Sequence, residues 1–126
     1  MLGVILLSGC SRTYVTVSDG KVSENVSASY NLGKLESVLS KDINTLMVAS
    51  EKALTDLKMA VVNKSQDQLV GKVEAYTSDG KDVTVSLTSL SAGVTRLTIV
   101  VGTRLTLGDE ARSRAIFQKI LENGGW

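Results

Sequence analysis

The feature that most constrains the fold is a two-residue alternation of apolar and mostly polar side chains in the second half of the chain. Val83, Val85 and Leu87 recur at every second position, and the segment Val94–Thr103 repeats the pattern. Successive side chains of a β-strand point to opposite faces, so each such run has one apolar and one polar face. The alternation therefore predicts an antiparallel sheet with one face that another layer must cover.

The turn within this region has a predicted length. The alternating residues on either side of Ser78-Asp79-Gly80 share one face only if the loop contains these three residues. The last residue of such a loop takes a left-handed backbone conformation, which glycine adopts without strain. We therefore expect Gly80 to have a positive φ and Val73 to face Val85 across the turn.

The first half of the chain predicts a hairpin and a helix. Two β-rich stretches, Tyr14–Ser18 and Lys21–Tyr30, flank Asp19-Gly20, a strong hairpin signal. From Leu35 to Leu57 the apolar residues recur at helical spacing, which predicts one long amphipathic helix. A strand is expected to follow at Met59–Val62.

A second helix is predicted near the end of the chain. Thr106 followed three residues later by Asp109 is similar to a capping box, and Gly124-Gly125 is a typical stop signal. The predicted apolar stripe consists of Ala111, Ala115, Ile116 and Ile120. We expect Arg112, Arg114 and Lys119 to lie mostly off that stripe.

Together these elements predict an α+β fold. We expect a two-layer sandwich with two helices on one face of a mainly antiparallel sheet of about five to six strands, in the order β-β-α-β-β-β-β-α. The 126 residues contain no proline, and 43% of them are hydrophobic, enough for one compact core. The predicted single domain covers residues 14–126.

Composition narrows the possible functions. The chain has one cysteine and no histidine, so it cannot form an internal disulfide or a multi-cysteine zinc site, and it lacks the commonest catalytic base. Its 14 basic and 13 acidic residues are scattered along the chain, so the sequence contains no basic cluster of the kind that binds nucleic acid. We expect no metal, no cofactor and no nucleic-acid partner.

The residues that remain give little support to catalysis. Ser-Lys neighbours occur at Ser40-Lys41 and Lys64-Ser65, but adjacency in sequence is not the geometry that acyl transfer requires. The acids Asp109-Glu110 are expected to serve the dipole of the final helix. The sequence therefore predicts a protein that is not an enzyme.

The start of the chain resembles a lipoprotein signal. The apolar residues Leu2–Leu7 lead into Leu7-Ser8-Gly9-Cys10, which resembles a lipobox, and the chain then turns polar. The resemblance implies that residues 1–9 are removed, that Cys10 carries a diacylglycerol, and that the new amino terminus is acylated too. Residues 10–13 would then form a short tether. Several acyl chains, at about 0.8 kcal/mol per buried CH₂, hold a protein almost permanently at a membrane.

Two observations qualify this interpretation. The apolar segment is shorter than the roughly 7 to 15 residues of a usual signal and no basic residue precedes it, which indicates a trimmed or misassigned start. Alternatively, Met1–Leu7 is an ordinary buried strand and Cys10 a small core residue. Ser11 stands where an aspartate would imply inner-membrane retention, so the resemblance implies an outer-membrane location facing the periplasm.

Two functional alternatives remain open. The first is a lipid-anchored binding or scaffolding module in the cell envelope that engages a protein partner through its polar sheet face, an exposed edge strand or the helix pair. The second is a soluble small-molecule-binding domain without a lipid anchor, although aromatic residues, which commonly line such pockets, are few. The candidate partner-binding surface consists of Lys72, Glu74, Tyr76, Thr84, Arg96 and Thr98.

Several segments of the chain resemble the short bacterial lipoproteins of the "domain of unknown function" family number 3568. The resemblance rests on Ala53-Leu54, Gly71-Lys72-Val73-Glu74-Ala75, Asp79-Gly80-Lys81, Thr95 through Val101-Gly102, and Gly108-Asp109-Glu110. The chain departs from the family pattern by extra residues around Arg104–Leu107. The family implies no activity and no catalytic residues. A looser likeness, in the arrangement of helices on one sheet face, is to helix-grip domains of outer-membrane assembly lipoproteins.

Overall fold

The computed structural model of the 126-residue chain describes the backbone of residues 10–18, 21–102 and 109–124. These residues form seven strands and two helices. Their bounds are β1 Cys10–Ser18, β2 Lys21–Asn31, β3 Lys34–Leu39, α1 Ile43–Asp56, β4 Ala60–Gln66, β5 Val70–Tyr76, β6 Asp82–Ser91, β7 Val94–Val101 and α2 Glu110–Asn123.

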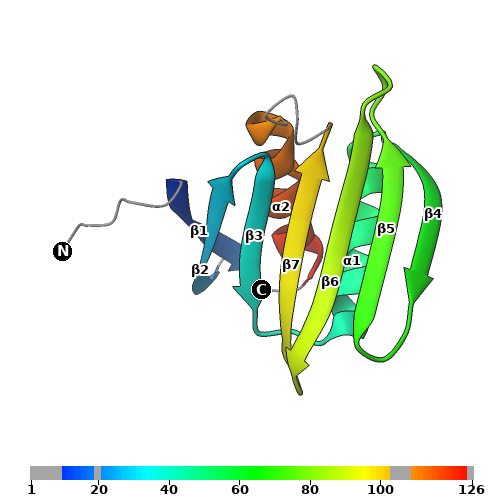
Figure 1. Ribbon diagram of the computed structural model, residues 1–126. Coiled ribbons are helices and arrows are strands. Elements are labelled where there is room, and N and C mark those ends of the chain that lie inside the picture. The colour runs from blue at the N-terminus through cyan, green and yellow to red at the C-terminus, as the bar shows by residue number, and fades with distance from the viewer. Residues whose placement is uncertain (1–9, 19–20, 103–108, 125–126) are drawn as a thin grey trace.

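The strands form one antiparallel sheet in the order β1-β2-β3-β7-β6-β5-β4. Both helices lie side by side on one face of this sheet (Figure 1). The predicted α+β class and the two-layer arrangement are confirmed. The predicted elements occur in the predicted order, and one further strand, β3, lies between the second strand and the first helix.

The turn between β5 and β6 has the predicted geometry. Val73 pairs with Val85, and the N–H of Thr77 donates to the carbonyl of Lys81 at 2.9 Å, which closes a loop of residues 78–80. Gly80 has φ +86°. The alternation had predicted this register because a shift by one residue would turn the buried side chains to solvent.

The prediction of one long helix from Leu35 to Leu57 is wrong at its start. Leu35 and Leu39 lie on the buried face of β3, and α1 begins only at Ile43. The carboxylate of Asp42 caps α1 by accepting the N–H of Thr45 at 2.8 Å. Leu35, Val38 and Leu39 fit helical spacing, but Val38 is 54% exposed on the opposite face of the strand.

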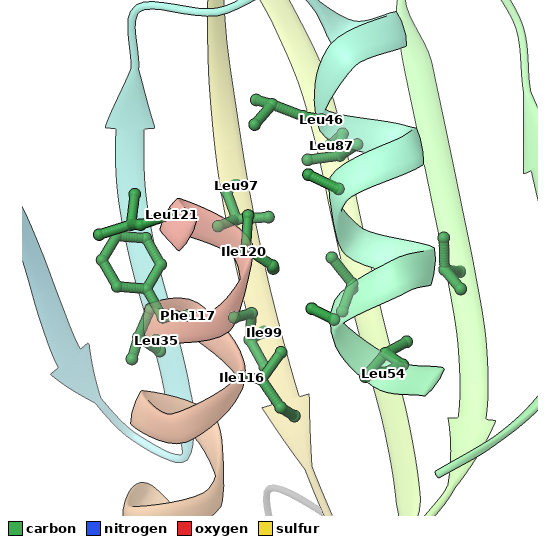
Figure 2. Close-up of a cluster of buried hydrophobic side chains, with 14 of the residues drawn as sticks. Leu35, Leu46, Leu54, Leu87, Leu97, Ile99, Ile116, Phe117, Ile120 and Leu121 are labelled. Atoms are coloured by element: carbon green, nitrogen blue, oxygen red, sulfur yellow. The ribbon is translucent and has the colours of Figure 1, made fainter. Parts of the chain in front are cut away.

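The core lies between the sheet and the two helices (Figure 2). Phe117 and Ile120 of α2 lie against Leu35 of β3 and Leu97 of β7, and Leu54 projects from α1 toward the same layer. Each of these side chains is fully buried. Burial of one such side chain contributes about 1.5–3 kcal/mol, so this layer holds the helices on the sheet.

The second helix is rotated relative to the predicted one. Ala111 and Ala115, expected on the apolar stripe, are exposed, whereas Ile116 and Ile120 are buried as predicted. Phe117 takes part in the core, and larger apolar side chains gain more from burial than alanine does. Arg114, expected off the stripe, is only 8% exposed.

The start of α2 also differs from the prediction. Asp109 is itself the N-cap, and its carboxylate accepts the N–H of Arg112 at 3.0 Å. The capping box had assigned that role to Thr106, which lies outside the described residues. Aspartate is among the best N-cap residues, so the helix can begin without Thr106.

Candidate partner-binding surface and anchor

The six predicted surface residues lie together on the face of the sheet that the helices leave uncovered. Lys72, Glu74 and Tyr76 project from β5, Thr84 from β6, and Arg96 and Thr98 from β7. Glu74 is directly opposite Thr84, and Ser86 lies between Lys72 and Thr98. We call these six residues the outer sheet face. The alternation had predicted this orientation, because the side chains between the buried ones of a strand point to the opposite face of the sheet.

Two contacts on this face were not predicted. Asn63 of β4 donates to the carboxylate of Glu74 at 2.9 Å, and Arg96 lies 3.6 Å from the carboxylate of Glu36 on β3. Both pairs are exposed, so each contributes little to stability. Glu36 was missed because β3 had been predicted as helix. The contacts of the outer sheet face therefore reach β4 on one side and β3 on the other.

A groove borders the outer sheet face where β2 and β3 diverge. The pairing of these strands ends at Ser29–Glu36, and beyond it the hydroxyl of Ser37 donates to the carbonyl of Ser27 at 2.6 Å. The groove has a volume of about 580 Å³ and is lined in part by Ser29, Glu36 and Arg96. It is open to solvent and largely polar, unlike the enclosed apolar pockets that small molecules usually occupy.

Two segments that carried the family resemblance meet at one end of the sheet. Asp79 and Lys81 come from the β5–β6 turn, and Asp109 and Arg112 from the start of α2. Arg112 lies 3.0 Å from the carboxylate of Asp79, and Lys81 lies 3.7 Å from that of Asp109. We call these four residues the end cluster. Their contacts join the turn to the helix, which is a structural role.

Hydrogen bonds to Asp79 of the end cluster lower the pKa of its carboxyl group below its ordinary value. The hydroxyl of Thr77 is the larger cause and the guanidinium of Arg112 the next. Both donate to the charged form of the carboxylate and stabilise it. Asp79 is exposed, so the lowered pKa reflects local contacts that hold the turn and gives no indication of a catalytic acid.

Cys10 lies in β1. Its backbone pairs with Tyr30 of β2, and Thr13 pairs with Ser27. Residues 10–13, predicted as a tether, therefore lie in a strand of the sheet. The other lipobox residues, Leu7, Ser8 and Gly9, lie outside the described residues.

One of the two Ser-Lys pairs, Lys64 and Ser65, is divided between the two faces of the sheet. Lys64 and Ser65 are neighbours on β4 and point to opposite faces, and Lys64 lies 2.9 Å from the carboxylate of Glu51 on α1. Among residues 10–18, 21–102 and 109–124, no three His, Cys, Asp or Glu side chains are grouped to hold a metal ion. In the same part of the chain no helix is long and apolar enough to cross a membrane.

Comparison with known proteins identifies the family. No curated protein matches the chain. The model of the family described as "Protein of unknown function (DUF3568)" matches residues 1–123, which include all nine elements of the fold. The chain therefore belongs to the DUF3568 family.

Proposed function

We propose that this protein is a lipid-anchored, non-catalytic binding module of the bacterial cell envelope. The observation that carries the proposal is the position of Cys10. The residue that ends the lipobox-like sequence is paired with Tyr30 of β2 within the sheet, so a lipid on Cys10 would be attached directly to the sheet. A domain fastened in this way stays next to the headgroups and does not reach across the periplasm.

The outer sheet face is the proposed partner-binding surface. It presents positive and negative charges, hydroxyl groups and one aromatic side chain on three paired strands. The pairing of the strands holds these groups in fixed relative positions. Tyrosine and arginine are enriched at protein interfaces, and Tyr76 and Arg96 are both exposed here. The face between the sheet and the helices is filled by the core and offers no comparable surface.

A position-specific crosslink tests this assignment in intact cells. We would place p-benzoylphenylalanine at Tyr76 on the outer sheet face and, as the matched control, at Val48 on the exposed side of α1. Both positions are exposed, and only Tyr76 belongs to the proposed surface. We expect a discrete protein adduct from Tyr76→p-benzoylphenylalanine and none from the Val48 variant.

The Cys10→Ala substitution tests the anchor in the same crosslinking experiment. If the anchor brings the domain to its partner, this substitution should remove the protein from the membrane fraction and reduce the Tyr76 adduct. Adducts of equal yield from Tyr76 and Val48 would contradict the assignment of the surface. An unchanged membrane fraction for Cys10→Ala would contradict the anchor.

A further inference from the structure

We propose that the turn between β2 and β3 inserts Leu32 into the membrane interface beside the lipid on Cys10. This inference rests on the proposed function, because it needs the lipid anchor. The turn would form a second contact of the domain with the bilayer. Together the two contacts would fix the orientation of the sheet relative to the membrane surface.

The pairing of β1 with β2 places the turn close to the anchor. Cys10 pairs with Tyr30, and the β2–β3 turn follows two residues later, with Asn31 paired to Lys34. At about 3.3 Å per strand residue, Leu32 lies within about 7 Å of the level of Cys10 along the sheet. Figure 1 shows the start of β1 and the β2–β3 turn at the same end of the molecule. A lipid on Cys10 would therefore bring this turn to the bilayer.

Leu32 is an unusual residue for its position. Leu32 and Gly33 form a two-residue turn with φ of +54° and +80°, a conformation in which asparagine or glycine is strongly preferred at the first position. A leucine there strains its backbone. The leucine side chain is also 72% exposed, the largest value among the exposed large hydrophobic residues of the described chain. Because its side chain is exposed, Leu32 gains little burial energy in the fold to offset that backbone strain.

A bilayer supplies the burial that the fold does not. An apolar side chain at the membrane interface leaves water, and a basic residue close behind it is attracted to anionic headgroups. Lys34 follows Leu32 by two residues, at the other side of the turn. Leu32 at the tip and Lys34 behind it match the order of acyl chains and headgroups in a bilayer.

Another exposed leucine, Leu69, gives a matched control. Leu69 is 63% exposed and lies in the β4–β5 connection. Because every neighbouring pair of strands is antiparallel, this connection lies at the opposite end of the sheet from the β2–β3 turn. A general affinity of exposed leucines for lipid would affect both positions, whereas an insertion set by the anchor affects only Leu32.

The test measures lipid contact at the two leucines. The chain has a single cysteine, which the anchor occupies, so Leu32→Cys and Leu69→Cys each introduce one free thiol for a polarity-sensitive fluorophore. The mature labelled proteins are reconstituted into vesicles of phosphatidylethanolamine and phosphatidylglycerol, with or without brominated acyl chains. We expect a blue-shifted emission that brominated lipid quenches for Leu32→Cys, and aqueous, unquenched emission for Leu69→Cys.

The mass of each mature protein separates the two proposals. An acylated Cys10 together with equal quenching at both positions would overturn the insertion and leave the anchor intact. A blue shift at Leu32→Cys without quenching would indicate that protein covers the turn, and would overturn the insertion as well. An unacylated Cys10 would overturn the anchor, and the insertion with it.

Discussion

The two halves of the sheet differ in how completely their strands pair. From β4 to β7 each strand runs beside its neighbour over most of its length, and buried side chains recur at every second position in β5, β7 and the first part of β6. On the other side, β1 pairs with β2 at eight positions, but β2 and β3 share only three paired positions and then diverge into a groove. The irregular half carries the groove, the Leu32 turn and Cys10, so both proposed membrane contacts lie there, whereas the proposed partner-binding surface lies on β5, β6 and β7 in the regular half.

The largest predicted effect tests whether the irregular half depends on α2. Phe117 is fully buried and lies next to Leu35 of β3 (Figure 2). Phe117→Ala is expected to lower the free energy of unfolding by about 3–5 kcal/mol, through lost burial and the cavity that remains. Urea denaturation measures the loss.

Amide exchange of the same variant tests the comparison of the two halves. We expect amide exchange to accelerate more in β2 and β3 than in β5 and β6, because β5 and β6 retain their packing against α1. Leu54→Ala is the matched control, since Leu54 is a fully buried residue of α1. Uniform acceleration over all strands in both variants would show that the sheet responds as one unit.

The next effect concerns the cap of α2. Asp109→Ala removes the acceptor for the N–H of Arg112 and should cost about 1–2 kcal/mol of stability. Asp109→Asn keeps a good N-cap but loses the charge that faces Lys81, so it should cost much less. Thermal unfolding of the two variants compares them. Equal losses would mean that the ion pairs matter more than the cap.

The strain at Leu32 gives a smaller effect of opposite sign. Leu32→Asn should raise the free energy of unfolding of the unanchored domain by about 0.5–1 kcal/mol, because asparagine adopts positive φ at less cost. Lys58→Asn is the matched control in the other half, since Lys58 also has a positive φ, of +65°. Chemical denaturation checks both variants. A loss of stability in Leu32→Asn would show that Leu32 serves the fold after all.

The smallest effect is the pH dependence of the end cluster. The pKa of Asp79 is lowered in the folded state, so its hydrogen bonds stabilise the fold above the ordinary pKa of 3.8 and are lost as the pH falls through the lower folded value. The difference in melting temperature between the unsubstituted protein and Asp79→Asn should therefore shrink below about pH 4. A difference that stays constant between pH 7 and pH 2.5 would contradict this origin.

The same comparison explains what the sequence could predict. The β5–β6 register, the positive φ of Gly80 and the outer sheet face follow from alternation and turn chemistry, which are local properties. The strand β3 was missed because Leu35, Val38 and Leu39 satisfy helical spacing as well, and the pairing with β7 stabilises the strand over the helix. The rotation of α2 likewise depends on which side chains fill the core.

The end cluster and the groove were beyond prediction for a related reason. Asp79 and Arg112 are far apart in sequence, so their contact depends on where α2 docks. The groove arises from the divergence of two strands of which one was assigned to a helix. The signal that could have indicated β3 was the Asn31-Leu32-Gly33 turn followed by alternating Leu35, Ser37 and Leu39.

The mass of the N-terminal peptide from protein isolated out of native membranes tests the central claim most directly. The account predicts a peptide that begins at Cys10 and carries diacylglycerol and an amide-linked acyl chain. It also predicts that the Cys10→Ala variant keeps residues 1–9, is not acylated and is absent from the membrane fraction. A peptide that retains Met1–Gly9 with an unmodified thiol would contradict the anchor. Cys10 would then be an unmodified residue of the edge strand β1.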